Sequence, residues 1–205
     1  MIEFLSRYSD ILNVVLNAAM VVIWVAYLQV FTVNQLRQAR AVLHIDLGAA
    51  EGARSRCLVT NLSSSAIYVQ AIIAELTHEG HRSRTQITDK DELSPDDVDD
   101  PLSRTNRGTL QPGATVDIGS LENLVSRARI RLSEDWSSDH VEEVTITVVA
   151  IAGQVDRIVA ASKTFDAERS DAGTRFTAKQ LLTKQIRPRQ TREEFSKMLR
   201  EQTYQ

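Results

Sequence analysis

The sequence predicts a single membrane-spanning helix, then an all-β sandwich domain with one short helix, and finally a basic, partly helical C-terminal tail. Two observations support this. Residues 11–36 contain no Asp, Glu, Lys or Arg. After them, short segments of alternating apolar and polar residues are separated by turn residues, as in the strands of a sandwich. We expect a short segment at 1–10, the helix at 11–36, the β domain at 41–167 and the tail at 168–205.

The uncharged segment 11–36 is long enough to cross a bilayer. As a helix its 26 residues extend about 39 Å, and the hydrocarbon core is about 30 Å thick. A cleaved signal peptide is one alternative, but it would have a basic start and a shorter apolar stretch, and residues 1–10 carry two acids and one arginine. A buried helix of a soluble protein is the other alternative, although such helices rarely stay uncharged over this length.

Charges on the two sides of the helix predict its orientation. Arg37, Arg40, Arg54 and Arg56 follow the helix, whereas only Arg7 precedes it. By the positive-inside rule, the C-terminal side is expected in the cytoplasm. The predicted location is therefore the cell (inner) membrane, crossed once, with the N-terminus outside. The single cysteine of the chain agrees with a reducing compartment, because it cannot form an internal disulfide.

Three residues of the helix are expected to share one face. Asn13 and Asn17 are four residues apart and Trp24 follows seven residues later, which places all three on one side. An Asn amide in a bilayer is unfavourable without a partner, and cross-helix hydrogen bonds contribute about 0.6–2 kcal/mol. One interpretation is that the helix associates with itself or with another membrane subunit. The alternative is that both Asn side chains lie near the outer interface, where water or headgroups satisfy them.

The region after the helix has seven or eight expected strands. Residues 41–47 alternate, with Leu43, Ile45 and Leu47 facing one way. Further strands are expected at 54–61, 66–78, 85–88, 109–121 (two strands around a Pro-Gly turn), 142–153 and 157–168. The polar residues 62–65 are typical of a hairpin turn between the second and third strands.

One helix is expected to interrupt the strands at residues 120–129. Leu121, Leu124 and Val125 recur at helical spacing, and Glu122 lies in the first turn, where the helix dipole favours an acid. This helix is expected to close one end of the sandwich.

The segment VTNLSSSAIYV is an Asn-containing turn between two strands, and it resembles immunoglobulin-like modules at the level of the fold. The resemblance covers this one connection, and the Cys…Trp…Cys signature of antibody domains is absent. It implies an immunoglobulin-like sandwich and, because a fold hosts many functions, implies no activity.

Two charged segments stand out. Residues 89–100 contain seven acids and one lysine, which predicts an exposed loop. A calcium site or a docking surface for a basic partner are the alternatives, but the carboxylates lack the alternating positions and the glycine of a calcium loop.

The second charged segment is the tail. Its basic residues are Arg175, Lys179, Lys184, Arg187, Arg189 and Arg192, with no acid between the first and the last. Such a segment can lie on anionic lipid, at about 1 kcal/mol per basic residue, or bind nucleic acid or the acidic loop. A capping box at 191–194 then starts a short final helix with Phe195, Met198 and Leu199 on one face, which predicts a docking helix for a protein partner. A disordered basic tail is the remaining alternative.

No motif for catalysis is recognisable. His78 and His81 have His-x-x-His spacing but no second ligand pair, so no metal site is predicted, and no cofactor or small-molecule substrate is expected. The net charge of −3 does not favour nucleic acid. The predicted function is a membrane-anchored, non-enzymatic interaction module whose cytoplasmic sandwich binds an unknown protein partner, with homo-oligomerisation left open. The alternatives are an accessory subunit of a membrane complex, such as a transporter, assembled through the helix, or an exported ligand-binding sandwich if the orientation is reversed.

Overall fold

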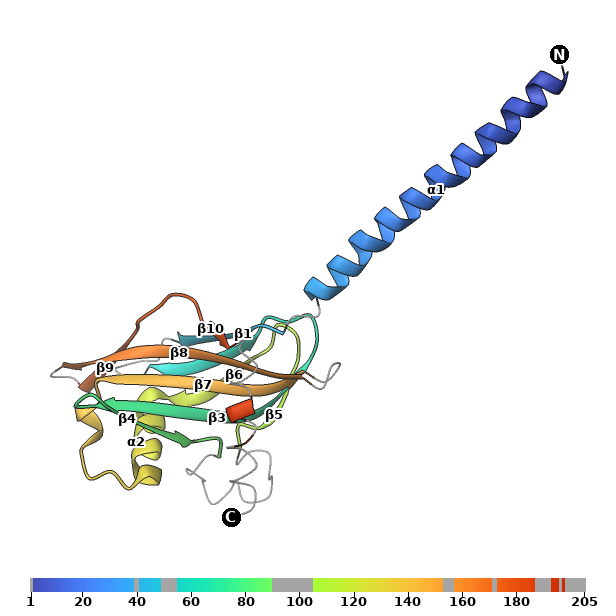
Figure 1. Ribbon diagram of the computed structural model, residues 1–205. Coiled ribbons are helices and arrows are strands. Elements are labelled where there is room, and N and C mark those ends of the chain that lie inside the picture. Colours follow the sequence, from blue (N-terminus) through green and yellow to red (C-terminus); the bar gives the residue numbers. More distant parts are fainter. Residues whose placement is uncertain are drawn as a thin grey trace. The chain divides into compact units, whose positions relative to one another are not determined.

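The computed structural model describes residues 2–38, 41–48, 55–89, 105–152, 157–170, 173–186, 193–195 and 197. The chain divides into two units, Met1–Arg40 and Ala41–Gln205. The first is a single helix and the second is a mostly antiparallel β domain with a few short helices (Figure 1).

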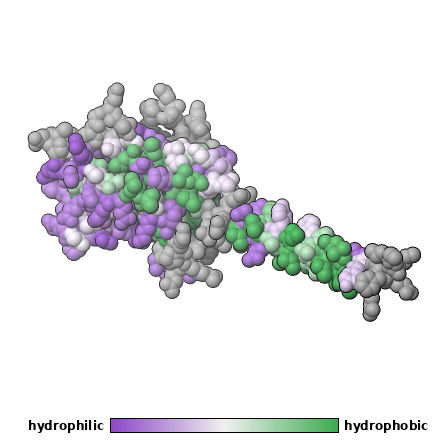
Figure 2. Space-filling view, turned by 90° about the horizontal axis from the view of Figure 1, so that it is seen from above, coloured by the Kyte–Doolittle hydropathy of each residue, from purple (hydrophilic) through white to green (hydrophobic). Residues whose placement is uncertain are grey.

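Helix α1 (Ile2–Gln38) forms the first unit. Its part Ile11–Gln35 has a mean hydropathy of 2.2 and is long and apolar enough to cross a membrane. Between Tyr8 and Val33, the large hydrophobic side chains of this helix are 41–68% exposed, and Figure 2 shows them along its surface. None of this span is buried, unlike the core helix of a soluble protein.

The second unit contains two antiparallel sheets. The smaller sheet has the order β1-β2-β6, formed by β1 (Leu43–Gly48), β2 (Arg56–Asn61) and β6 (Thr115–Ser120). The larger sheet has the order β10-β8-β7-β3-β4, with β5 also paired to β3 and β9 to β8. Its strands are β3 (Ile67–His78), β4 (His81–Gln86), β5 (Gly108–Leu110), β7 (Glu143–Ala152), β8 (Arg157–Ser170), β9 (Gly173–Ala178) and β10 (Lys184–Ile186).

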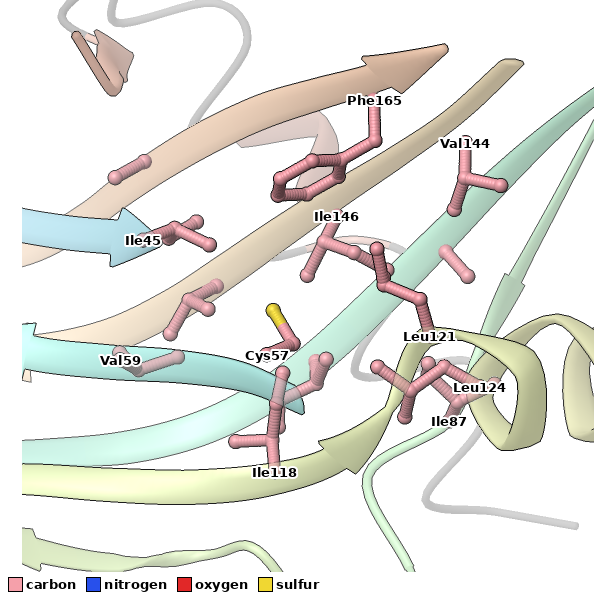
Figure 3. Close-up of a cluster of buried hydrophobic side chains, with 14 of the residues drawn as sticks. Ile45, Cys57, Val59, Ile87, Ile118, Leu121, Leu124, Val144, Ile146 and Phe165 are labelled. Atoms are coloured by element: carbon pink, nitrogen blue, oxygen red, sulfur yellow. The ribbon is translucent and has the colours of Figure 1, made fainter. Parts of the chain in front are cut away.

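The core lies between the two sheets (Figure 3). Ile45 and Val59 of the smaller sheet and Ile146 and Phe165 of the larger sheet belong to one cluster and are fully buried. The expected alternation of residues 41–47 is confirmed, because Leu43 and Ile45 are buried and Leu47 packs against the same cluster. Each large side chain buried here contributes about 1.5–3 kcal/mol, so the shared core holds the sheets together.

Helix α2 (Leu121–Leu132) confirms the helix expected at 120–129. The Ser120 hydroxyl caps its start by accepting a hydrogen bond from the backbone N–H of Asn123 over 3.3 Å. Leu121, Leu124 and Val125 are buried in the main core. A 3-10 helix (Ser138–His140) follows before β7.

The turn at residues 62–65 does not close a hairpin, and this prediction is wrong. β2 lies in the smaller sheet and β3 in the larger one, so the chain crosses between the sheets here. Asn61 holds the crossing: its Nδ2 donates to the carbonyls of Ser65 and Leu110, and its Oδ1 accepts from the N–H of Ser63, each over 2.9 Å. A short polar segment alone cannot distinguish such a crossing from a hairpin.

A tight hairpin joins β3 to β4. Its two turn residues, Glu79 and Gly80, both have positive φ, 47° and 75°. Such a pair forms the tight turn that matches the twist of a hairpin. β4 therefore begins directly after this turn, earlier than the edge strand expected at 85–88.

The larger sheet continues beyond residue 167, where the sequence predicted the start of a tail. β8 extends to Ser170, and both β9 and β10 pair with its outer edge. Phe176 on β9 belongs to the main core and is 5% exposed. Much of the segment predicted as a basic tail is thus part of the β domain.

A β-bulge in β3 creates a second, smaller apolar cluster on the outer face of the larger sheet. Val69 pairs with Ala150 and Ala71 with Val149, so Gln70 is an extra residue with no partner in β7. Beyond the bulge, Ala71 and Ile73 belong to this outer cluster, together with Val149, Ala160 and Phe195.

Candidate interaction surfaces

The outer face of the larger sheet carries a groove of about 480 Å³, here called the sheet groove. Charged and hydroxyl side chains line it, together with the apolar side chains of Leu182, Ile186 and Phe195. One row of paired residues crosses it: Arg84 of β4, Glu75 of β3, Thr145 of β7 and Thr164 of β8. Residues paired in this way have neighbouring side chains. Arg84 Nη2 donates to Glu75 Oε2 over 2.7 Å, and the hydroxyls of Thr145 and Thr164 are 2.9 Å apart. The groove therefore presents charges and hydroxyl groups.

Cations outnumber carboxylates in the sheet groove. Its cations are Arg82, Arg84, Lys163, Lys179 and Lys184, and its carboxylates are Glu75 and Glu143. Lys179 donates to Glu143, and this hydrogen bond, with the charges of Glu143 and Asp166, raises the pKa of Lys179 above its usual value. Lys163 pairs with Asp46 and Lys179 with Glu143. The remaining excess of positive charge, from Arg82, Arg84 and Lys184 against Glu75, suits an anionic group on a partner.

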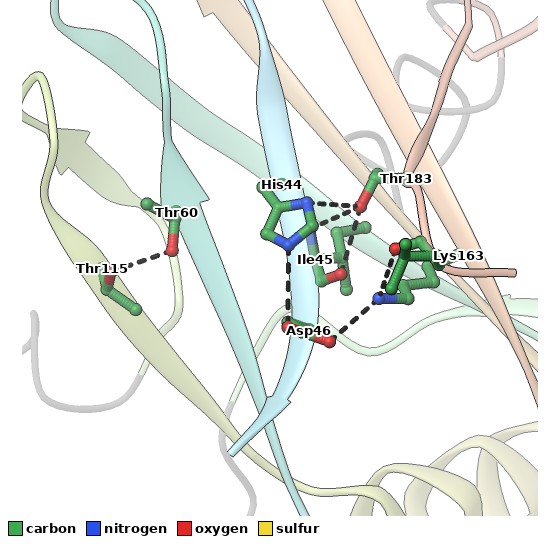
Figure 4. A network of polar contacts seen from close by, with 8 residues as sticks. His44, Ile45, Asp46, Thr60, Thr115, Lys163 and Thr183 are labelled. Atoms are coloured by element: carbon green, nitrogen blue, oxygen red, sulfur yellow. Dashed lines mark hydrogen bonds and ion pairs between the residues drawn. The ribbon is translucent and has the colours of Figure 1, made fainter. Parts of the chain in front are cut away.

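The second candidate surface is the edge of β1 that does not pair with β2 (Figure 4). Thr183 Oγ1 accepts a hydrogen bond from the N–H of Ile45 over 2.8 Å and donates to its carbonyl over 3.1 Å. Gln185 accepts from the N–H of Leu43 over 3.3 Å and donates to its carbonyl over 2.6 Å. These two side chains, here called the edge clasp, supply the hydrogen bonds that another strand would otherwise make with β1.

An ion pair between a buried lysine and an exposed aspartate lies next to the edge clasp. The Lys163 side chain is 2% exposed, and its Nζ donates to Asp46 Oδ1 over 2.9 Å and to the carbonyl of Leu181 over 3.4 Å. Burial alone would raise the pKa of Asp46, but the hydrogen bond and charge of Lys163, with the backbone N–H of Leu47, hold that pKa below its usual value. Asp46 therefore stays ionised at neutral pH and compensates the buried ammonium.

The helix residues that the sequence singled out lie on the surface of α1. Asn13, Asn17 and Trp24 are exposed, and Trp24 packs edge-on against Tyr27 with ring centroids 6.4 Å apart. Their role in helix packing stays a prediction.

The predicted basic residues are divided between strands and connections. Arg175 is exposed on β9, Lys179 follows that strand directly, and Lys184 is exposed on β10. Arg187, Arg189, Arg192, Met198 and Leu199 lie outside the described residues, as does the acidic loop after Asp89 as far as residue 100.

Phe195, which the sequence predicts as part of a docking face, packs against the β domain in the structure. It is 4% exposed and packs on the outer cluster of the larger sheet, with the Arg84 guanidinium 5.9 Å from its ring centroid. The reason is the bulge in β3, which leaves Ala71 and Ile73 on the outer face, and Phe195 removes them from water.

Cys57 and His78 have structural surroundings. Burial, reinforced by the nearby charge of Asp117, raises the pKa of the Cys57 thiol to about 12, which makes it a poor nucleophile. His78 stacks on Trp136 at 4.7 Å, and its Nδ1 lies 2.9 Å from the carbonyl oxygen of His140. Within the described part of the chain, no three His, Cys, Asp or Glu side chains gather in an arrangement that could hold a metal ion.

Sequence reasoning missed both the sheet groove and the edge clasp. In the sequence, Thr174 and Phe176 alternate with Gly173, Arg175 and Thr177, and this alternation is the signal that could have found β9. Thr183 and Gln185 carry no such local signal.

Comparisons with known proteins add no function. No family model matches the chain, and no curated protein matches it. A solved structure described as a protein from Archaeoglobus fulgidus is 9% identical and covers 73% of this chain and 98% of its own, with a TM-score of 0.18. A similarity this weak carries no argument about fold or function.

Proposed function

We propose that this protein is a single-pass membrane protein that holds its β domain at the cytoplasmic surface of the cell (inner) membrane, where the domain binds a protein partner without catalysing a reaction. The observation that carries the proposal is the span Ile11–Gln35, with a mean hydropathy of 2.2 and no buried residue. Exposed apolar surface is unfavourable in water by about 25 cal/mol per Å², and a bilayer removes that surface from water.

The orientation rests on the distribution of arginine. Arg37, Arg40, Arg54 and Arg56 follow the span, and only Arg7 precedes it. This bias supports a cytoplasmic β domain and an external N-terminus.

An immunoglobulin-like topology is part of the proposal, supported by the strand order. In such sandwiches, strands A, B and E share one sheet and strands C, F and G the other. Here β1, β2 and β6 stand in the places of A, B and E, and β3, β7 and β8 in those of C, F and G. Helix α2 and the edge strands β9 and β10 are additions to that arrangement.

The sheet groove is the surface that we assign to the partner. Its excess of cations supports a partner with an acidic segment. Tethering raises the local concentration of the domain at the membrane, so a weak contact with another membrane-bound protein would be sufficient.

Reporter fusions test the topology. A reporter that is active only outside the cytoplasm, fused after Gln205, should be silent, and a reporter that fluoresces only in the cytoplasm should be bright at the same place. The chain should also stay with the membrane after an alkaline carbonate wash. The reverse pattern of reporters would contradict the proposal and favour the exported ligand-binding sandwich.

Charge reversal tests the partner surface. The full chain is purified from membranes with its bound partners, either unchanged or with Arg82→Glu, a groove cation outside residues 179–184. Arg175→Glu is the matched control, because Arg175 is exposed on β9 and does not line the sheet groove. A partner that is lost with the groove variant and kept with the control supports the proposal, whereas equal recovery with both variants contradicts it.

A second candidate function is an accessory subunit of a membrane complex, or a homo-oligomer, assembled through α1. One observation favours it: polar, aromatic and Met residues recur along α1 at alternating spacings of four and three. They are Asn13, Asn17, Met20, Trp24, Tyr27, Phe31 and Asn34. This spacing is that of the contact seam in left-handed helix packing, and Asn amides are both donors and acceptors.

Substitutions in this row of α1 residues, here called the seam, distinguish the two candidate functions. Asn13→Leu with Asn17→Leu should abolish assembly in native gels of membrane extracts if the helix carries it. Gln29→Leu is the matched control, because Gln29 lies on the opposite side of α1. Assembly that survives both sets of changes excludes this function for the seam.

A further inference from the structure

Two adjacent leucines are the most exposed large hydrophobic side chains among the described residues. Leu181 is 87% exposed and Leu182 74%, whereas the other large hydrophobic side chains do not exceed 68%. Both lie between β9 and β10, in residues 179–184, here called the leucine strap, where the chain leaves the edge of β8 (Figure 1). Elsewhere on the described surface of the β domain, the exposed Leu62, Tyr68 and Ile130 are not adjacent in the sequence.

Hydrogen bonds hold the leucine strap in place. At its start, the N–H of Lys179 donates to the carbonyl of Thr164 over 3.0 Å. In its middle, Lys163 donates to the carbonyl of Leu181, and near its end Thr183 bonds to the backbone of Ile45. These contacts fix the backbone on both sides of the leucines, so their exposure is a property of the fold.

All charged residues around the leucine strap in the sequence are basic. Residues 175–192 contain six cations and no carboxylate. Lys179 is engaged with Glu143 and Asp166, but Lys184 is exposed on β10. Leucines flanked by basic residues are the composition of segments that lie in the headgroup region of anionic membranes, with the apolar side chains inserted and the cations at the phosphates.

The covalent chain keeps the leucine strap within reach of a membrane that α1 spans. Thr183 contacts Ile45, which follows Gln38, the last residue of α1, by seven residues. Seven residues extend at most about 25 Å. The local concentration of lipid at the strap is therefore high.

We propose that the leucine strap is a second membrane contact, which inserts Leu181 and Leu182 into the headgroup region of an anionic bilayer. The inference rests on the proposed anchoring by α1 and deepens it, because it assigns a lipid-binding surface to the β domain itself. Leu182 and Lys184 border the sheet groove, which Phe195 also lines, but Phe195 is 4% exposed and packs on the outer cluster, so it does not take part in the lipid contact.

The test uses the full chain in lipid nanodiscs that contain about 30% anionic lipid. Leu182→Cys is labelled with an environment-sensitive fluorophore. The native thiol of Cys57 is buried and has a raised pKa, so it stays unlabelled in the folded protein. The matched control is Ile130→Cys on α2, because Ile130 is 66% exposed and Figure 1 places α2 away from the strap.

We expect iodide quenching of the label at position 182 to fall about threefold or more in anionic nanodiscs relative to detergent micelles, since the headgroup region shields the label. The label at position 130 should not change. Lys184→Gln, or salt raised from about 0.01 M to about 1 M, should restore quenching at position 182, because the attraction to anionic lipid is screened.

Protection that is no stronger in anionic than in zwitterionic nanodiscs overturns the proposal. Protection that appears only after a cell extract is added also overturns it and assigns the strap to a protein partner. A chain that does not co-purify with nanodiscs contradicts the anchor itself, whereas a chain that does so with a fully exposed label contradicts only the role of the strap.

Discussion

The C-terminal sequence covers two surfaces of the β domain by opposite chemistry. Thr183 and Gln185 cover the edge of β1 with hydrogen bonds, whereas Phe195 covers the outer face of the larger sheet by burial. The edge presents backbone N–H and C=O groups, and the outer face presents Ala71 and Ile73. The chemistry of the exposed surface therefore determines the kind of residue that packs on it. Unpaired backbone groups bind polar side chains, and apolar side chains contact an aromatic ring.

The edge clasp and Phe195 should also contribute differently to the free energy of unfolding, because one makes hydrogen bonds and the other buries apolar surface. A backbone group that loses its hydrogen bond away from water destabilises the fold by about 1–3 kcal/mol. Burial of a large apolar side chain contributes about 1.5–3 kcal/mol in total. Since the edge clasp satisfies both groups of two residues, its loss should be more damaging than the loss of Phe195.

Removing the edge clasp should have the largest effect. Thr183→Val with Gln185→Leu keeps side-chain size but leaves the edge groups of Leu43 and Ile45 without partners. We expect the free energy of unfolding to fall by about 3 kcal/mol, measured by denaturation of the full chain in detergent. Thr177→Val, at an exposed position of β9, is the control and should be nearly neutral. A loss of under about 1 kcal/mol for the double variant would show that the clasp is dispensable.

Removing the Phe195 side chain should have an intermediate effect on the free energy of unfolding. Phe195→Ala returns the outer cluster to water, and we expect a loss of about 2 kcal/mol in the same measurement. Phe195→Leu should recover most of this loss, because it retains much of the buried apolar area. Equal stability of Phe195→Ala and the unchanged protein would contradict the contact.

Labelling of Cys57 should distinguish the two contacts, because Cys57 pairs with Leu47 of β1 and reports on opening at this side of the domain. Its rate of reaction with a thiol reagent under native conditions should rise at least about tenfold in the clasp variant, because about 1.4 kcal/mol of local destabilisation already produces a tenfold increase. The rate should change little in Phe195→Ala. An equal increase of the labelling rate in both variants would mean that the edge clasp and the contact of Phe195 open together.

Acid should produce the smallest effect. The pKa of Asp46 is lower in the folded protein than its usual value of 3.8, so the unfolded chain binds more protons as the pH falls. The stabilisation by Asp46 is therefore present above about pH 4 and is lost as the pH falls through the folded pKa. Because the Asp46 side chain is 57% exposed, solvent screening should keep this contribution under about 1 kcal/mol.

Substitution checks the acid effect. Asp46→Asn should lower the free energy of unfolding at pH 7, and the difference from the unchanged protein should shrink toward pH 3. Asp139→Asn, at an exposed position, controls for the general loss of a carboxylate. A difference that stays constant with pH would exclude Asp46 as its source.

The sequence predicted those parts of the fold that depend on neighbouring residues. The apolar span, the alternation of Leu43 and Ile45 and the helix after Ser120 were all visible in local spacing. The crossing at residues 62–65 was not, because its contacts include the carbonyl of Leu110, 49 positions from Asn61, and no local spacing reveals such a partner.

The candidate surfaces were less predictable because they join distant parts of the chain. Thr183 and Gln185 bond to residues 138 and 142 positions earlier, and no local pattern marks them. For Phe195, the sequence identified an apolar contact but not its occupant, which is the outer face of the larger sheet. That face is apolar there only because of a register shift in β3.

The bulge in β3 also has an evolutionary consequence. If the codon for Gln70 were lost, Val69 and Ala71 would follow each other as Ala150 and Val149 do on β7, and the ladder would close in regular register. No side chain of β3 would change faces, although a deletion within a regular strand turns the residues beyond it to the opposite face. A deletion of one codon at this position would therefore leave the buried and the outer faces of β3 unchanged.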